Sequence, residues 1–248
     1  KLIGPYSGLI AGAALIVDYV LTITISIASG IDALFSLLPI KFQTYKLTIE
    51  ALALIFLMML NLRGMKESIK VLMPIFLSFF ISHVILIIYG IVAHGNLLPF
   101  LFVDTVQETK QLTQTMGWVF VAALFLRAYS LGGGTYTGLE AVSNNVNQLA
   151  EPRVTTGKWT MFYMAVSLSF TAGGIILLYL LWHVQPVEGQ TLNASVFHKI
   201  LGAWHFGPEL LLFLLAAEAG LLFVGANTGF LGGPTVLANM AIDKWVPN

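Results

Sequence analysis

The sequence contains no cysteine, and only 10% of its residues are charged. The absence of cysteine excludes disulfide bonds and thiolate metal sites, and it leaves the redox compartment undefined. Because soluble domains typically carry about 25% charged residues, the low charge excludes an ordinary soluble protein. The formal net charge is zero, which provides no basic surface for a nucleic-acid partner. What remains is a chain that is 57% hydrophobic, and this composition indicates an integral membrane protein.

The two ends of the sequence lack the usual boundary signals. The chain begins at Lys1 without a methionine, and no charged n-region with a cleavage site precedes the first apolar run. It ends at Asn248, shortly after an amphipathic stretch. We therefore expect an internal fragment of a longer protein, in which residues 1–248 form a single transmembrane domain that is incomplete at both ends.

Long apolar runs predict the membrane spans, because a helix needs about 20 apolar residues to cross a bilayer. By this length the sequence contains about six candidates. They cover residues 8–31, 47–62, 71–93, 116–149, 161–182 and 206–230. The fourth run is too long for one straight crossing. The expected fold class is therefore an all-α integral membrane protein in which one transmembrane helix is broken.

Between and after these runs we expect loops and turns. The connections at residues 94–115 and 183–205 are expected to be loops. In the second of them, Asn193-Ala-Ser195 matches the N-glycosylation triplet, a short and common pattern. Residues 232–247 begin with Gly-Gly-Pro and end near Lys244 and Trp245, which suit the headgroup level. This segment predicts a turn followed by a short interfacial helix.

Basic residues gather in two short turns between the predicted spans. The first turn contains Arg63, Lys66 and Lys70, and the second contains Arg153 and Lys158. The positive-inside rule places both turns in the cytoplasm. The first span then runs outward, so that both ends of the fragment are expected on the cytoplasmic side of the plasma membrane.

Glycines interrupt the fourth apolar run, and they predict the break in the helix because each costs about 1 kcal/mol relative to alanine in a helix interior. These glycines are Gly132, Gly133, Gly134 and Gly138. Thr137 and Glu140 share a face of the second half-helix, where hydroxyl, carboxylate and free carbonyl oxygens are ligands for a hard monovalent cation. The alternative is a glycine kink for close helix packing, with Glu140 paired to Arg127 or Lys158. Both interpretations stay open.

The first span carries a polar stripe. Asp18, Thr22 and Ser26 lie four residues apart and therefore share one helix face. Hydroxyl groups alone would suggest bonds to the helix backbone or close packing against a neighbour. A carboxylate at membrane depth needs a cation, a proton or a cationic partner, so Asp18 favours a functional face. Tyr19 lies on the adjacent face, where packed tyrosines are common.

Two further titratable residues lie within predicted spans. Glu218 falls near the middle of the sixth run, where it is either a proton-carrying carboxylate or the partner of Arg127 in a structural ion pair. His83 falls in the third run. A proton relay is one interpretation of that histidine, and a hydrogen-bonded structural role is the favoured one.

Two stretches resemble a known superfamily. Residues 61–68 resemble the loop after the fourth helix of amino acid–polyamine–organocation (APC) permeases. Residues 227–234 and 237–247 resemble the eighth helix and the following loop of the same permeases. The resemblance makes the predicted spans family helices three to eight. It implies a partial leucine-transporter-type bundle, whose complete form has two inverted five-helix repeats and a midplane site between broken helices.

A narrower resemblance is to potassium uptake permeases of the KUP type and the KimA-like branch. Its motifs are Asp-x-x-Leu-Thr-x-x-Ile-Ser, here residues 18–26, and Thr-Gly-x-Glu-Ala, here residues 137–141. The resemblance implies a potassium pathway, with K⁺ bound and H⁺ as the coupling ion, and no other cofactor. The residues that it implies for this pathway are Asp18, Tyr19, Thr22, Ser26, Thr137 and Glu140.

The favoured function is secondary active transport by proton-coupled potassium uptake. A proton-coupled amino acid permease is the alternative, although Glu140 would repel a substrate carboxylate at the break. A channel is disfavoured because a selectivity filter needs a re-entrant loop between full spans. An enzyme is not expected, since no metal-ligand cluster or nucleophile motif occurs. The expected partners are a small inorganic cation or an amino acid and the lipid bilayer, and a homodimer is left open.

Overall fold

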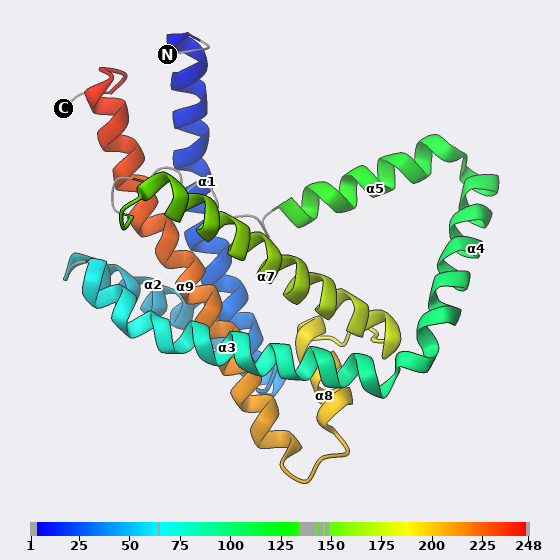
Figure 1. Ribbon diagram of the computed structural model, residues 1–248. Helices are drawn as coiled ribbons and strands as arrows, with labels where there is room; N and C mark the ends of the chain where they lie inside the picture. The colour runs from blue at the N-terminus through cyan, green and yellow to red at the C-terminus, as the bar shows by residue number, and fades with distance from the viewer. Residues whose placement is uncertain (1–3, 64, 134–141, 143–145, 147–148, 247–248) are drawn as a thin grey trace.

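The computed structural model describes residues 4–63, 65–133, 142, 146 and 149–246 of the chain. All regular elements in these residues are helices (Figure 1). They are α1 (Pro5–Phe35), α2 (Lys46–Leu62), α3 (Met65–Ala93), α4 (Leu98–Met116), α5 (Trp118–Gly132), α7 (Arg153–Leu181), α8 (Leu192–Leu201) and α9 (Gly207–Ile242). Short 3₁₀ turns at Ile40–Tyr45 and Gly95–Leu97 precede α2 and α4.

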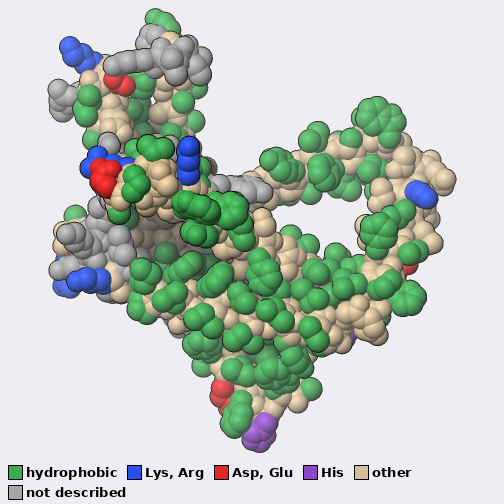
Figure 2. All heavy atoms as spheres, viewed as in Figure 1, with side chains coloured by type: hydrophobic (Ala, Val, Ile, Leu, Met, Phe, Trp, Pro, Cys, Tyr) green, Lys and Arg blue, Asp and Glu red, His purple; other side chains and the backbone are tan. Residues whose placement is uncertain are grey.

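Five helical segments are long and apolar enough to cross a membrane. They are Tyr6–Phe35, Ile40–Leu62, Met73–Ala93, Arg153–Leu181 and Gly207–Ile242, and the shorter apolar helix Trp118–Gly132 corresponds to the first half of the predicted broken span. Figure 2 shows hydrophobic side chains over most of the visible face, with charged side chains in small separate groups. This surface suits contact with hydrocarbon, and it confirms the predicted class of all-α membrane protein.

Helices α1 and α9 run antiparallel and pack along their length, with the start of α1 and the end of α9 at the same end of the molecule (Figure 1). Glycines of α9 permit the close approach. A Cβ atom added at Gly232 would lie 2.5 Å from Cζ of Tyr19, and one at Gly229 would lie 2.6 Å from Cγ1 of Ile23. Small residues at such interfaces let helix backbones approach closely in a membrane. The packing of α1 on α9 therefore fixes the position of the polar face of α1.

The prediction of a turn after the sixth span is wrong. Helix α9 continues without interruption through Pro234 to Ile242. Proline and glycine disfavour a helix interior, but tertiary packing supplies the compensation here. Val236 and Met240, which follow the proline, are 6% and 4% exposed and pack in one cluster with Tyr19 of α1. Packing against α1 therefore stabilises a helical conformation in a segment whose local sequence predicts a turn.

Two segments expected to be loops are helical. Helix α4 occupies much of the first connection, and Gly117, at a φ of 86°, joins it to α5. Together α4 and α5 form an arm that stands away from the other helices (Figure 1). The hydroxyls of Thr105, Thr109 and Thr113 each donate to the carbonyl four residues earlier, so that the polar side chains of α4 are accommodated along the helix itself.

Helix α8 lies within the second connection and is the centre of the largest buried cluster. Its side chains Val196, Phe197, Ile200 and Leu201 are at most 2% exposed, and they pack among residues of α3, α7 and α9. Thr191 caps the helix by accepting a hydrogen bond from the Ala194 amide at 3.2 Å. Side-chain capping of this kind satisfies an otherwise free backbone donor. The polar network described below is built on this helix.

Candidate functional site

The polar stripe of α1 is only partly enclosed. Thr22 is 8% exposed and Ser26 is half-buried, whereas Asp18 is exposed. A Cβ atom added at Gly225 of α9 would lie 3.6 Å from Oγ of Ser26, so the serine hydroxyl lies beside α9. The stripe therefore consists of a buried hydroxyl at Thr22, a hydroxyl beside α9 at Ser26 and an exposed carboxylate at Asp18, so that its polar atoms are all oxygens.

Tyr19 occupies the packed side of α1. Its side chain is 1% exposed, and it lies against α9 at Gly232, Val236 and Met240. The structure thus places Tyr19 in the interface between the two helices. Tyr19 therefore helps to hold α1, and with it the polar stripe, against α9.

The predicted break falls largely outside the described residues. Helix α5 ends at Gly132, and the amide of Gly133 donates to the carbonyl of Ser130. Among the described residues, a Cβ atom at either glycine would meet nothing within 4 Å. The remaining residues assigned to the break and its ligands, Gly134, Thr137, Gly138 and Glu140, lie outside the described part of the chain.

Arg127 lies on α5 with its side chain exposed. The ion pairs between described residues join Lys46 to Asp32 and Arg153 to Glu151. Arg127 and Glu218 are thus not brought together as an ion pair. Glu218 instead belongs to a different set of contacts, which the sequence does not display.

Glu218 of α9 takes part in a hydrogen-bonded chain that crosses three helices. Its Oε1 accepts a hydrogen bond from Nδ2 of Asn193, the second residue of α8. Oδ1 of the same amide accepts a hydrogen bond from the hydroxyl of Tyr179 on α7. The second carboxylate oxygen, Oε2, is buried and has no hydrogen-bond partner in the part of the chain that the structure describes. These hydrogen bonds fix the orientation of the Asn193 amide, because its oxygen and its nitrogen each bind a different partner.

Sequence reasoning found Glu218 but missed its two partners. Asn193 stood out only as part of a glycosylation triplet, yet its amide is engaged inside the protein, and the following Ala194 and Ser195 are 3% and 7% exposed. Tyr179 carried no signal, since one tyrosine in an apolar helix is common. Membrane-depth position alone identified the carboxylate.

His83 of α3 is fully buried near the same helix α8. Its Nδ1 lies 2.9 Å from the carbonyl of Phe79 and 3.2 Å from Oγ of Ser82. Its ring stacks on Phe79 at 3.8 Å between centroids and meets Phe197 edge-on at 5.3 Å. Nε2 has no partner. This aromatic packing with one backbone hydrogen bond agrees with the favoured structural interpretation.

The two stretches that carry the broader resemblance meet in space. Nδ2 of Asn61, at the end of α2, donates to Oδ1 of Asn227 on α9 at 2.6 Å and to the carbonyl of Leu57 at 2.9 Å. Asn227 is 4% exposed. The amide pair therefore ties the end of α2 to the middle of α9, where a buried polar group requires a partner.

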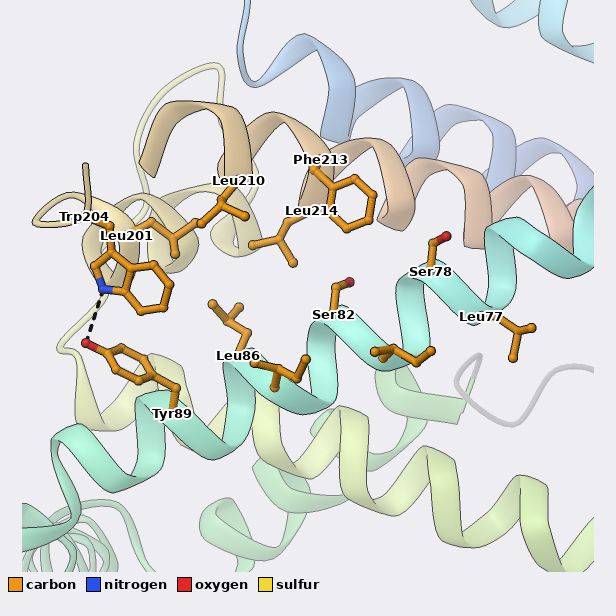
Figure 3. Close-up of a pocket in the computed structure, with 12 residues that line it drawn as sticks. Leu77, Ser78, Ser82, Leu86, Tyr89, Leu201, Trp204, Leu210, Phe213 and Leu214 are labelled. Carbon is orange, nitrogen blue, oxygen red and sulfur yellow. Dashed lines mark hydrogen bonds between the residues drawn. The ribbon is translucent and has the colours of Figure 1, made fainter. Parts of the chain in front are cut away.

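An apolar groove of about 410 Å³ runs between α3 and α9 (Figure 3). At one end Nε1 of Trp204 donates to the hydroxyl of Tyr89 at 3.2 Å. The two serines along the groove are already paired, since Ser78 donates to the carbonyl of Pro74 and Ser82 to that of Phe79. The groove thus offers hydrocarbon contact rather than ligands for an ion, and it is separate from the polar sites.

Long apolar helices that enclose hydroxyl, amide and carboxylate groups define a multi-pass membrane protein. The chain belongs to the amino acid permease family, whose family model matches residues 1–248. It is also 30% identical over 247 residues to "Potassium transporter KimA" of Bacillus subtilis (strain 168). That match covers 99% of this chain and 39% of the relative, so the chain spans well under half the length of that protein.

These findings confirm the predicted resemblance to the APC superfamily and to its KimA-like branch. The chain is therefore a multi-pass part of a member of this superfamily, and its described helices form a partial bundle of that type. The choice between an inorganic cation and an amino acid as substrate is taken up next.

Proposed function

We propose that the full-length protein takes up potassium by proton-coupled symport across the plasma membrane. The observation that carries the proposal is the face of α1, on which the buried Thr22, the half-buried Ser26 and the carboxylate of Asp18 offer only oxygen atoms. Dipolar and anionic oxygens replace the hydration shell of K⁺ in proteins. The similarity to a protein named as a potassium transporter supports the same substrate.

In this proposal Thr137 and Glu140 supply the opposite wall of the ion site. Both follow the three consecutive glycines of the predicted broken span, Gly132 to Gly134, where free carbonyls at the end of the first half-helix add further oxygen ligands. The basic turns around Arg63 and Arg153 lie in the cytoplasm, and protons supply the driving force without any further cofactor.

The proposal predicts that removal of either carboxylate abolishes transport. In the full-length protein, Asp18→Asn and Glu140→Gln should each end growth rescue of a host that lacks its own potassium uptake, because the bound cation loses its anionic ligand. Asp104→Asn is the matched control, since Asp104 is exposed on α4, away from the stripe. Undiminished rescue by both site variants would remove the basis of the potassium assignment.

A proton-coupled amino acid permease is the second candidate, and the description of the matching family supports it. An amino acid substrate needs a site for its carboxylate at a half-helix N-terminus, and Glu140 near the break would repel that group. Uptake of labelled rubidium and of labelled amino acids into proteoliposomes separates the two. Rubidium uptake without amino acid uptake supports the potassium proposal, and the converse replaces it.

A further inference from the structure

The hydrogen-bonded chain of Tyr179, Asn193 and Glu218 lies apart from the residues assigned to the ion site. Its parts come from α7, α8 and α9, whereas the proposed potassium ligands lie on α1 and beyond the break after α5. Only Oε1 of the carboxyl group is satisfied, by the Asn193 amide. The buried Oε2 without a partner is the feature that needs an explanation.

An ionised carboxylate in this position would be costly. Burying an unpaired charge is far less favourable than burying a neutral polar group, so such groups bind a counterion or take up a proton. Glu218 forms no ion pair with any residue in the described part of the chain. Its nearest neighbours along α9, including Leu214, Leu215, Ala217 and Ala219, are buried apolar residues.

The environment of Oε2 distinguishes a proton from a metal cation. A hard cation needs several oxygen ligands at once, as the carbonyl rings of potassium sites illustrate. Oε2 has no hydrogen-bond partner among the described residues, and Oε1 is occupied by an amide donor, which repels a cation. A proton needs no ligand other than the oxygen that carries it. The site therefore fits a proton and does not fit K⁺.

We propose that Glu218 is the proton-binding site of the transporter, with Oε2 as the atom that carries the proton and with Asn193 and Tyr179 as positioning residues. This inference rests on the proposed function, because it assigns the coupling ion of that transport to a place in the fold. The proton exchanges between water and Oε2, and no other bond is made or broken.

The two positioning residues, Tyr179 and Asn193, have different roles. The Tyr179 hydroxyl donates to Oδ1 of Asn193 and thereby keeps Nδ2 directed at Glu218. When the proton leaves, the bond from Nδ2 becomes a charge-assisted one, which is roughly twice as strong as its neutral counterpart. Release of the proton thus tightens the attachment of α8 to α9, and binding of the proton loosens it.

Helix α8 is placed to transmit this change. The amide of Thr191 at its start donates to Oγ of Ser36 at the end of α1, at 2.9 Å. At its far end, Lys199 donates to the carbonyls of Trp182 and His183 after α7, at 3.2 and 2.8 Å. Proton occupancy at Glu218 is therefore coupled to an element that joins α1, α7 and α9.

Other titratable groups lie on the elements packed around this site. They include His83 on α3, Asp32 on α1, Tyr179 on α7, His198 and Lys199 on α8, and Glu209 on α9 itself. Asp32 is paired with Lys46, and Lys199 is held by backbone carbonyls. Glu209 is exposed and makes a suitable control. His83 has its Nδ1 at the Phe79 carbonyl, so its variant belongs in the experiment.

The first test uses infrared spectroscopy of the purified full-length protein in lipid. The wild type should show the carbonyl-stretch band of a protonated carboxyl group, and this band should disappear as the pH is raised. Glu218→Gln should lack it, whereas Glu209→Gln and His83→Gln should retain it. A band that persists in Glu218→Gln, or one that potassium abolishes at constant pH, overturns the proposal.

The second test concerns the positioning residues, and it does not depend on the stability of the Glu218 variant. Tyr179→Phe leaves the carboxyl group in place but releases the amide, so the pH at which the band disappears should change. Asn193→Leu removes the donor to the carboxylate and should raise that pH further, because the ionised form loses its hydrogen bond. An unchanged pH in both variants contradicts the assigned roles.

The third test separates this inference from the proposed substrate. In proteoliposomes, Glu218→Gln should lose rubidium accumulation driven by a pH gradient but retain rubidium exchange at equal concentrations. Accumulation at the wild-type level would overturn the proton site. If the wild type itself transports no rubidium, the proposed function fails, and the infrared band still decides whether Glu218 binds the proton.

Discussion

At the scale of single residues, the protein uses polar side chains sparingly and places each against a particular neighbour. The Ser26 hydroxyl lies beside α9, and Asn61 meets Asn227 where α2 ends. In an apolar interior each such group requires a partner, because an unsatisfied donor or acceptor costs about 1–3 kcal/mol. Among the described residues, four buried polar atoms lack a hydrogen-bond partner: Oδ1 of Asn61, Nε2 of His83, Nδ1 of His94 and Oε2 of Glu218. Oε2 of Glu218 is the one that belongs to a carboxyl group, and a carboxyl group within an apolar span indicates function rather than packing.

Glycine at position 232 is a residue-scale requirement that can be tested. Gly232→Ala should lower the thermal stability of the full-length protein in detergent, since its Cβ would lie 2.5 Å from Cζ of Tyr19. Overpacking of this kind typically costs about 1–3 kcal/mol. Gly173→Ala on α7 is the control, because its Cβ would meet nothing within 4 Å. Equal melting temperatures for both variants would show that the α1–α9 contact is looser than described.

At the scale of elements, α8 is the helix that connects the others. It is short, and a helix of this length is marginal without tertiary contacts. Its buried face and its cap supply them, while Lys199 satisfies free carbonyls at the end of α7. Helices α4 and α5 represent the opposite case, since no residue of either is buried in the described structure.

The cap of α8 supports a prediction at this scale. Thr191→Ala should accelerate hydrogen exchange at the first amides of α8, because the Ala194 amide loses its side-chain acceptor. Loss of an N-cap costs about 1 kcal/mol, which corresponds to roughly a fivefold faster exchange in that turn. Thr109→Ala on α4 removes a hydroxyl that bonds only its own helix, so exchange in α8 should be unchanged in that variant. Similar exchange in α8 for wild type and Thr191→Ala would contradict the role of the cap.

At the scale of the whole molecule, the fold presents an apolar surface around the antiparallel helices α1 and α9. The start of α1 and the end of α9 lie at the same end of the molecule (Figure 1). That geometry agrees with an even number of crossings between the two ends. The orientation in the membrane is a prediction from the basic turns.

Residues 1–248 contain no cysteine, so single thiols introduced into this part of the protein can report its orientation. Glu151→Cys places a thiol in the predicted cytoplasmic turn before α7, and Glu188→Cys places one in the connection between α7 and α8; both positions are exposed. A membrane-impermeant maleimide applied to intact cells should label only the variant at position 188. Both variants should react after permeabilisation. Labelling of position 151 in intact cells would reverse the orientation.

Much of the fold could be predicted from the sequence, because membrane spans depend on local composition. Apolar runs identified the five spanning helices and the first half of the broken one. Local rules failed where packing outweighs them. Pro234 lies inside α9 because Val236 and Met240 pack on Tyr19, and α8 forms because Phe197 and Ile200 are buried by its neighbours.

The sequence by itself determined the class of protein, the position of its apolar helices and the three carboxylates within the predicted spans, Asp18, Glu140 and Glu218, because these follow from local composition and spacing. Only the tertiary structure decided which side chains meet. Tyr179, Asn193 and Glu218 belong to three helices, and no periodicity relates them. Hydrogen bonds act over a few ångströms of space and are indifferent to separation along the chain, so this network exists only once α7, α8 and α9 have packed.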